Sequence, residues 1–208
     1  MPEPVSKLTL YGSCVSGNCL KPKWIADVLG VDYDWVEIDL LQGDTKTDEF
    51  LAMNPVGQVP LARWPDGRSL PQSNAIMLYL AEAQGSDLIP VDPFKKAQMM
   101  SWLFWEQYSH ETAIAVRRWH KHYLQKPDDE IDPDLLPKGR RALGIMEMQL
   151  TYTDWLVGDA ITLADVALVA YTRVAHEGGF DLSEFPSVER WVSRTEAALN
   201  IPHAREAA

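Results

Sequence analysis

Apolar and polar residues in the first 83 positions form short alternating runs separated by helical stretches. The segment YDWVEIDL alternates, which is typical of a strand with one buried face. The segment SNAIMLYLAEA indicates a helix that Ser73 or Asn74 would cap. Pro-Asp-Gly at 65–67 is a turn signal, after which a fourth strand would fit. In chain order, the pattern predicts a strand at 7–11, a helix at 23–29 ending at Gly30, a strand at 33–40, a helix at 47–53, a strand at 58–64 and a helix at 73–83.

The pattern changes after residue 83. Residues 84–94 are rich in Gly, Pro and Asp and are predicted to form a linker, and beyond them only helical signals occur. The predicted helices are 95–124, 138–156, 162–175 and 187–199, with an acidic loop at 126–137. We therefore expect an α/β domain at 1–83, a linker at 84–94 and an all-helical domain at 95–208.

Charge and composition narrow the classes of function. The formal net charge is -11, with -5 in residues 1–83 and -6 in the remainder, so the acidity is spread over the chain. This balance argues against binding to nucleic acid or to anionic membranes, and its simplest meaning is solubility. We expect no signal peptide in MPEPVSKLTL and no membrane span, hence a cytoplasmic protein. The two cysteines lie five residues apart, which is neither a CxxC redox pair nor a disulfide framework.

The segment NPVGQVP, 54–60, is the most informative one. Val59-Pro60 stands at the start of a predicted strand, where proline removes a donor from the strand ladder. One interpretation is a cis peptide, which would turn the Val59 backbone toward an extended peptide ligand. The other is an ordinary proline on an edge strand. The local residues do not decide between them.

The segment LPQSNAI, 70–76, offers groups for a charged ligand. Ser73 stands at a predicted helix N-terminus, where unbonded N–H groups and the helix dipole favour a carboxylate. Gln72 has an amide that can hold both an amine and a carboxylate. The alternative is a plain helix cap.

Taken together, these motifs resemble the cytosolic glutathione S-transferases. The segments NPVGQVP, QSNAIMLYLAE and WLVGDAITLADVALVA match that family in order and spacing over nearly the whole chain. The resemblance implies a thioredoxin-like domain followed by an all-α domain, glutathione as co-substrate, a homodimer, and a Ser-using, theta-like bacterial type. Within the last motif, Thr162 and Asp165 have the spacing of a capping box, which we interpret as structural.

The resemblance also implies a residue beside the glutathione sulfur. In the Ser- and Cys-using classes this residue lies five positions after a strand-end Tyr, and counting from Tyr11 gives Ser16. Cys14 is the alternative to Ser16 for the position beside the sulfur. Asn18 is a second donor to the sulfur. If Ser16 capped the helix, Pro22 would be its sixth residue and would disrupt it. We therefore expect the helix to begin nearer Cys19 or to kink.

The same resemblance assigns the remaining glutathione contacts. Thr45 stands where many relatives have a His for the glycine carboxylate, and the neighbouring Lys46 can supply that charge. Gln58 resembles the glutamine that contacts the tripeptide near its cysteinyl part. The expected glutathione-binding residues are Ser16, Asn18, Lys46, Gln58, Val59, Pro60, Gln72 and Ser73.

An electrophile is expected to bind against the long helix at 95–124. Tyr108, Glu111, Ala115 and Arg118 are three or four apart and would share one helix face. The alternative is that these residues form part of the core and of a solvated surface. HETAI is not the HExxH zinc motif, so we expect no metal.

We therefore predict a glutathione transferase that activates the thiol for attack on an electrophilic small molecule. One alternative is a glutathione-dependent peroxidase, disulfide reductase or isomerase on the same scaffold. Another is a non-catalytic scaffold that binds proteins. The sequence does not identify the electrophile.

Overall fold

The computed structural model describes residues 7–204 of the 208-residue chain. Residues 1–6 and 205–208 lie outside the described residues. The segment in which we expect no signal peptide, residues 1–10, therefore lies partly outside them. The chain divides into two compact units that adjoin at Ile89 and Pro90. The N-terminal unit carries the sheet and the C-terminal unit is helical, so the predicted fold class is confirmed.

The N-terminal unit is built on a four-stranded mixed sheet with the order β2-β1-β3-β4. β1 pairs in parallel with β2 and antiparallel with β3, which pairs antiparallel with β4. β3 is therefore an inner strand, and the interpretation of Pro60 as an edge-strand proline is wrong. The strands are β1 Leu8–Gly12, β2 Tyr33–Glu37, β3 Leu61–Arg63 and β4 Ser69–Pro71.

The register brings four chain segments to one end of this sheet. Tyr11 is paired with Leu61, and Leu61 is paired with Pro71. Gly12, at the end of β1, is paired with Glu37 at the end of β2. The loop after β1, the residues just before β3 and the residues just after β4 must therefore meet there.

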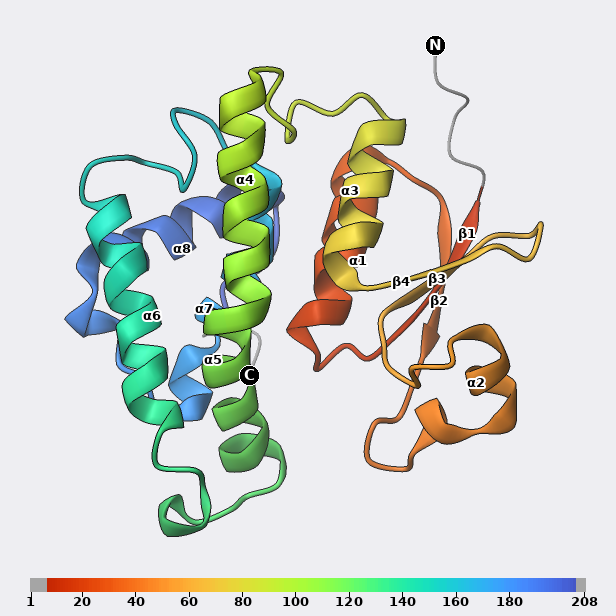
Figure 1. Cartoon of the computed structure of the whole chain (residues 1–208), viewed down its shortest axis with the longest axis horizontal. Helices are drawn as coiled ribbons and strands as arrows, with labels where there is room; N and C mark the ends of the chain where they lie inside the picture. The colour runs from red at the N-terminus through yellow and green to blue at the C-terminus, as the bar shows by residue number, and fades with distance from the viewer. Residues whose placement is uncertain (1–6, 205–208) are drawn as a thin grey trace. The chain divides into compact units, whose positions relative to one another are not determined.

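The helices of this unit cover both faces of the sheet (Figure 1). α1 Gly17–Leu29 and α3 Ser73–Ala83 pack against each other on one face, and α2 Asp48–Met53 lies on the other. β1 contributes side chains to both faces of the sheet, because buried Leu8 and Leu10 alternate with partly exposed residues. One of these, Tyr11, meets Phe50 of α2 edge to face.

Three predicted boundaries in this unit were wrong by three residues or more, and one of them is the start of β3, which lies at Leu61 rather than at residue 58. α1 begins at Gly17, not near Cys19 or at residue 23, and Pro22 is its sixth residue. Burial of neighbouring Trp24 and Ile25 offsets the backbone bond that Pro22 cannot make. β2 ends three residues early, because the Asp39 carboxylate accepts the N–H groups of the turn that follows.

The long helix of the C-terminal unit is not uniform. One helical run extends from 93 to 123, but it contains two π-helical turns, η2 Glu106–His110 and η3 Trp119–Tyr123. Each π turn shifts the side chains that follow relative to a regular helix. The α-helical parts are α4 Pro93–Trp105 and α5 Glu111–Arg118.

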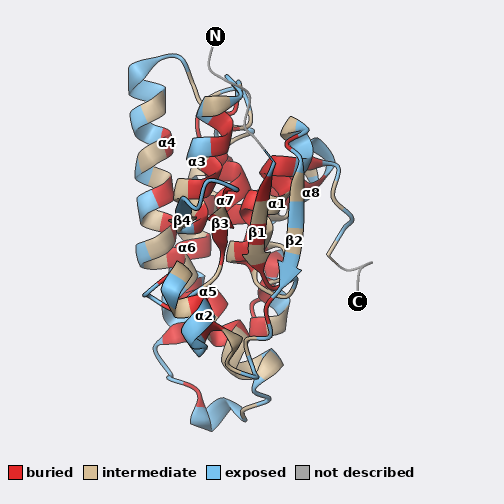
Figure 2. Ribbon diagram, turned by 90° about the vertical axis from the view of Figure 1, so that its right-hand side faces the viewer, coloured by how far each residue is buried: buried red, intermediate tan, exposed pale blue. Residues whose placement is uncertain are grey.

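The core of the C-terminal unit is α7 Leu163–Thr172, in which every residue is buried (Figure 2). The predicted capping box is present: the Thr162 hydroxyl accepts the Ala164 N–H, and the Asp165 carboxylate accepts the Thr162 N–H. The remaining α-helices are α6 Leu135–Leu150 and α8 Pro186–Leu199. α4, α5 and α8 pack around α7. Within residues 7–204, none of the helices has the length and apolarity needed to cross a membrane.

Candidate functional site

The loop after β1 is held in place by Glu37 at the end of β2. One oxygen of this carboxylate accepts the Ser13 hydroxyl and the Cys14 N–H, each at 2.9 Å, and the other accepts the Trp35 indole N–H at 2.7 Å. Partial burial alone would raise the pKa of Glu37, but these hydrogen bonds outweigh it and lower the pKa. Gly12 is required beside them, because a Cβ there would lie 2.6 Å from the Trp35 ring.

Ser16 stands at the N-cap position of α1, and its side chain makes no capping bond to the backbone. Its hydroxyl lies near the thiol of Cys19, whose pKa it lowers slightly against the larger effect of burial. Burial raises the pKa of Cys19 to about 11, so this thiol is neutral at physiological pH and is a weak partner. The N-terminus of α1 with its positive dipole end lies at the same point. The Ser16 hydroxyl can therefore turn to a better acceptor, such as a thiolate.

Asn18, in the first turn of α1, connects the two helices of the site. Its amide oxygen accepts the Lys21 ammonium at 2.7 Å and the Ser73 hydroxyl at 3.2 Å. The Ser73 hydroxyl therefore bonds to α1 rather than capping its own helix, and neither Ser73 nor Asn74 is the cap of α3. The structure thus brings Ser16, Asn18 and Ser73 to the same end of the sheet.

A second group of predicted residues gathers before β3. Lys46 donates to the Gly57 carbonyl at 2.9 Å, next to Gln58. Buried Asn54 donates to the Gln58 carbonyl at 2.7 Å and accepts the Val56 N–H at 3.3 Å, which shapes the loop. Gln58 is exposed.

The Val59-Pro60 peptide is cis, as one of the two interpretations required. Val59 is partly exposed and Pro60 is buried directly before β3. Within residues 7–204, the Val59 N–H and C=O do not take part in the hydrogen bonds of the sheet or of the adjoining turns. This backbone has the polar groups that an extended peptide needs for pairing.

Gln72 occupies the N-cap of α3 in an unusual backbone conformation, with φ 75° and ψ 117°. A residue other than glycine is strained there, and such strain is concentrated at ligand sites. The exposed Gln72 side chain does not cap the helix, so it does not satisfy the N–H groups at the positive end of α3. A carboxylate is the natural ligand of such a helix end.

The four residues predicted to contact an electrophile do not share one environment. Tyr108 lies in the π turn η2 and is 85% exposed, Glu111 is partly exposed, and Ala115 is buried. Arg118 is also buried and forms an ion pair with Glu177 at 2.5 Å within the C-terminal unit. Three of the four lie in the regular helix α5, whereas Tyr108 lies in the π turn at 106–110, which interrupts the regular helix expected from 95 to 124.

Cys14, the rival nucleophile, is exposed in the loop after β1. Its residual burial and the nearby Glu37 carboxylate both raise the pKa of its thiol. A reactive cysteine needs the opposite environment, one that favours the thiolate. The local electrostatics therefore weigh against Cys14 as a nucleophile.

Sequence reasoning missed three residues that organise this site, namely Lys21, Glu37 and Asn54. Lys21 is 0% exposed, which is rare for lysine and gives no signal in a sequence. Glu37 contacts residues 23 and 24 positions away, so only the fold reveals its role. Asn54 alone was open to prediction, since it stands at the start of the NPVGQVP motif.

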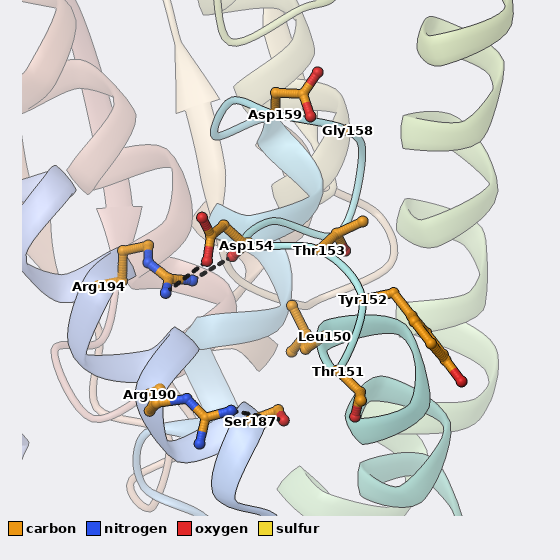
Figure 3. A pocket seen from close by; sticks show the side chains of 10 residues that line it. All are labelled: Leu150, Thr151, Tyr152, Thr153, Asp154, Gly158, Asp159, Ser187, Arg190 and Arg194. Atoms are coloured by element: carbon orange, nitrogen blue, oxygen red, sulfur yellow. Dashed lines mark hydrogen bonds and ion pairs between the residues drawn. The ribbon is translucent and has the colours of Figure 1, made fainter.

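A separate polar hollow of about 370 Å³ lies within the C-terminal unit, between the end of α6 and α8 (Figure 3). Both of its arginines have polar contacts there: Arg194 pairs with Asp154 at 2.8 Å, and Arg190 donates to the Ser187 hydroxyl at 3.0 Å. None of the predicted site residues lines it. Among the described residues, no group of three or more His, Cys, Asp or Glu side chains is arranged to hold a metal.

Comparisons with known proteins agree with this arrangement. The model of the glutathione S-transferase N-terminal domain matches residues 10–87, and that of the C-terminal domain matches residues 103–198. The crystal structure of a glutathione S-transferase from Pseudomonas fluorescens is 42% identical, with a TM-score of 0.91, over 96% of this chain and 100% of that chain.

More distant similarity extends to Ure2 proteins. The transcriptional regulator URE2 of Saccharomyces cerevisiae is 25% identical over 233 residues, covering 91% of this chain. The chain spans 65% of the length of that relative, and the same share of Ure2 from Eremothecium gossypii. A structure of Ure2p in complex with glutathione is 26% identical, with a TM-score of 0.81, over 93% of this chain and 91% of that chain. The domain models and the identity across nearly the full length place this chain in the glutathione S-transferase family.

Proposed function

We propose that this protein is a glutathione transferase that binds glutathione at the end of the N-terminal sheet. The observation that carries the proposal is the meeting there of Ser16 and Asn18, the Val59-Pro60 segment, and Gln72 with Ser73. Family membership makes glutathione the expected ligand, and the solved complex of the related Ure2p with glutathione adds support.

Each part of the tripeptide has a matching group. The cysteinyl backbone pairs with the Val59 N–H and C=O as an added strand. The γ-glutamyl end is held by Gln72, Ser73 and the N-terminus of α3. Lys46 carries the charge for the glycine carboxylate, with Gln58 beside the cysteinyl part. Thr45, which replaces the His of many relatives, is buried and leaves this task to Lys46.

The chemistry depends on the thiol of glutathione, because the thiolate is the reactive form. Lowering its pKa by about two units needs about 2.7 kcal/mol of extra stabilisation of the charged form. One hydrogen bond to a charged acceptor contributes about 1.5–3 kcal/mol. The Ser16 hydroxyl, helped by the Asn18 amide and the dipole of α1, accounts for this amount.

The reaction then proceeds by nucleophilic attack. The thiol gives up its proton, and the sulfur lone pair forms a bond to an electrophilic carbon. The displaced group leaves with the electron pair of its former bond. Of the predicted electrophile contacts, Tyr108 is the most accessible and Glu111 is second. Ala115 and Arg118 act in packing and in the Glu177 ion pair.

A homodimer, a cytoplasmic location and a role in detoxification belong to the same proposal and follow from the family. A disulfide reductase that uses Cys14 is the weaker alternative, since Glu37 disfavours its thiolate. The URE2 relatives favour a different second candidate, a non-catalytic protein with the same fold. A chain of that kind has no need of a group aimed at the sulfur.

Calorimetric titration with glutathione in two buffers of different ionisation heat tests the proposal. We expect binding with proton release near neutral pH, and the Ser16→Ala variant should release fewer protons. Binding without release from the wild-type protein would contradict thiolate activation and favour the non-catalytic candidate. Absence of binding at millimolar glutathione would overturn the glutathione site itself.

A further inference from the structure

Lys21 is an unusual feature of the N-terminal unit, because its side chain is 0% exposed. A buried ammonium is costly unless it is hydrogen bonded, so its position needs a reason. Its Nζ lies 2.7 Å from the Asn18 side-chain oxygen, three residues earlier on α1. Asn18 is also one of the two proposed donors to the glutathione sulfur.

The contact fixes the orientation of the Asn18 amide. A lysine ammonium carries three donors and no acceptor, so only the oxygen of an amide can lie against it. The two sides of an asparagine amide differ chemically but have nearly the same shape. Lys21 therefore turns the oxygen of Asn18 toward itself and the Nδ2 donor group away from itself.

The second partner of Asn18 cannot make this selection. The Ser73 hydroxyl, 3.2 Å from the amide oxygen, can donate to that oxygen but could equally accept from an NH₂ group. With Ser73 alone, both amide orientations would be compatible with a hydrogen bond. Of these two partners, Lys21, which cannot accept, is the one that makes a single orientation preferred.

We propose that Lys21 is a positioning residue, which holds the Asn18 amide with its donor side toward the glutathione sulfur. This inference rests on the proposed function. A thiolate is an acceptor, so it gains from the NH₂ side of Asn18 and is repelled by the oxygen side. Loss of Lys21 thus weakens the activation of the thiol without removing any group that touches it.

The surrounding charges require a control. Lys21 is itself a cation close to the site, and the Glu37 carboxylate, bonded to Ser13 and Cys14, is an anion in the same region. Cys19 stays neutral because burial raises its pKa to about 11. A direct electrostatic effect of Lys21 on the thiolate must therefore be separated from an effect that passes through Asn18.

The test is a pH titration of enzyme-bound glutathione, followed by the ultraviolet absorbance of the thiolate. In Lys21→Met, which keeps the length of the side chain but has no donor, the pKa of the bound thiol should rise by about one unit. kcat/KM near neutral pH should fall about threefold to fivefold and recover at higher pH. Binding of S-methylglutathione, which has no thiol to ionise, should be unchanged.

Matched variants define the route of the effect. Lys21→Arg retains the charge and the donors and should restore most of the shift. Lys23→Met removes a cation two residues away that pairs with Asp27, and it should leave the pKa of the bound thiol unchanged. In an Asn18→Ala background, Lys21→Met should add no further shift. If Lys21→Met does not fold, Lys21→Gln, which can donate and accept, should give a smaller shift in the same direction.

Two results would overturn the inference while leaving the proposed function intact. One is an unchanged thiol pKa in the folded Lys21→Met or Lys21→Gln protein, with normal activation in the wild type. The other is a shift of equal size with and without Asn18, which would make Lys21 a direct electrostatic group. A wild-type protein that fails to bind glutathione would overturn both the proposed function and the inference.

Discussion

The two units of this protein each bury a polar network, and the networks are completed in different ways. In the C-terminal unit, Asp165 is 0% exposed, and its carboxylate accepts the Leu156 N–H at 3.0 Å and the Trp191 indole N–H at 2.8 Å. Its other oxygen accepts the Thr162 N–H. Burial raises the pKa of Asp165, and these hydrogen bonds only partly oppose it.

The network of the N-terminal unit also gathers donors around an acceptor, but this acceptor belongs to an amide that carries donors of its own. Its centre is the Asn18 amide oxygen, which receives donors from α1 and from α3 and so turns the donor side of the amide elsewhere. The Asp165 network gathers donors from residues 156, 162 and 191 around one acceptor, which fixes the start of α7. The Asn18 network lies at the end of the sheet, where the proposed ligand binds. The comparison separates a polar network that stabilises a fold from one that orients groups for a ligand.

The largest expected effect is on stability and concerns the Asp165 network. Asp165→Ala leaves the Leu156, Thr162 and Trp191 donors buried without their acceptor, and should lower the free energy of unfolding by about 3–5 kcal/mol. Chemical denaturation measures it. Asp159→Ala is the control, since that carboxylate is 98% exposed and lies 3.8 Å from Lys95. Equal losses in the two variants would refute a structural role for the network.

A smaller effect is expected at Asn54, which shapes the loop before β3. Asn54→Ala removes the partners of the Gln58 carbonyl and the Val56 N–H, and should cost about 1–3 kcal/mol of stability. Because the loop carries Val59, glutathione affinity should also fall. The control is Gln42→Ala in an exposed turn. Normal affinity in the folded Asn54→Ala variant would show that the loop shape does not matter for the ligand.

Substitution of Gln72 by glycine should raise the stability of the fold and lower the affinity for glutathione. Gln72→Gly relieves the strained conformation at φ 75° and should stabilise the fold by about 0.5–1 kcal/mol. It also removes a proposed contact to the γ-glutamyl end, so glutathione should bind more weakly. Gln84→Gly, at the other end of α3 with φ -92°, should bring no gain in stability. Loss of stability in Gln72→Gly would contradict the strain argument.

The smallest effect concerns pH and the loop after β1. The pKa of Glu37 is lowered in the folded protein, so its contribution to stability is present above its ordinary value of 4.5. The contribution is lost as the pH falls through the lower, folded value. Denaturation of wild type and Glu37→Gln should show a wild-type advantage near neutral pH that disappears in acid. A stability advantage of the wild type over Glu37→Gln that persists or grows in acid would contradict the lowered pKa of Glu37.

Local signals in the sequence were enough for elements that depend on neighbouring residues. The helix at 73–83 and the capping box of Thr162 and Asp165 were predicted and confirmed. The start of α1 was mistaken, because the rule against proline in a helix ignores the packing that offsets the lost bond. The π turn at 106–110 has no signature in the sequence, and it interrupts the regular helix on which the predicted shared face of Tyr108 and Arg118 depends.

The sequence motifs of the candidate site could be predicted, but the positions of these motifs relative to one another could not. The segments around Ser16, Val59 and Gln72 were identified separately, and only the strand register explains why they meet. The bond from Ser73 to Asn18 spans 55 residues, and burial of Lys21 follows from the packing of helices. Such contacts depend on the complete fold, and no local pattern encodes them.

A crystal structure of the protein with bound glutathione would decide whether Ser16 and Asn18 contact the sulfur. We expect the sulfur within hydrogen-bonding distance of Ser16 Oγ and Asn18 Nδ2, with the cysteinyl backbone paired to Val59. We also expect that the Asn18 oxygen remains on Lys21. A sulfur next to Cys14, or an Asn18 amide that presents its oxygen to the ligand, would contradict the account.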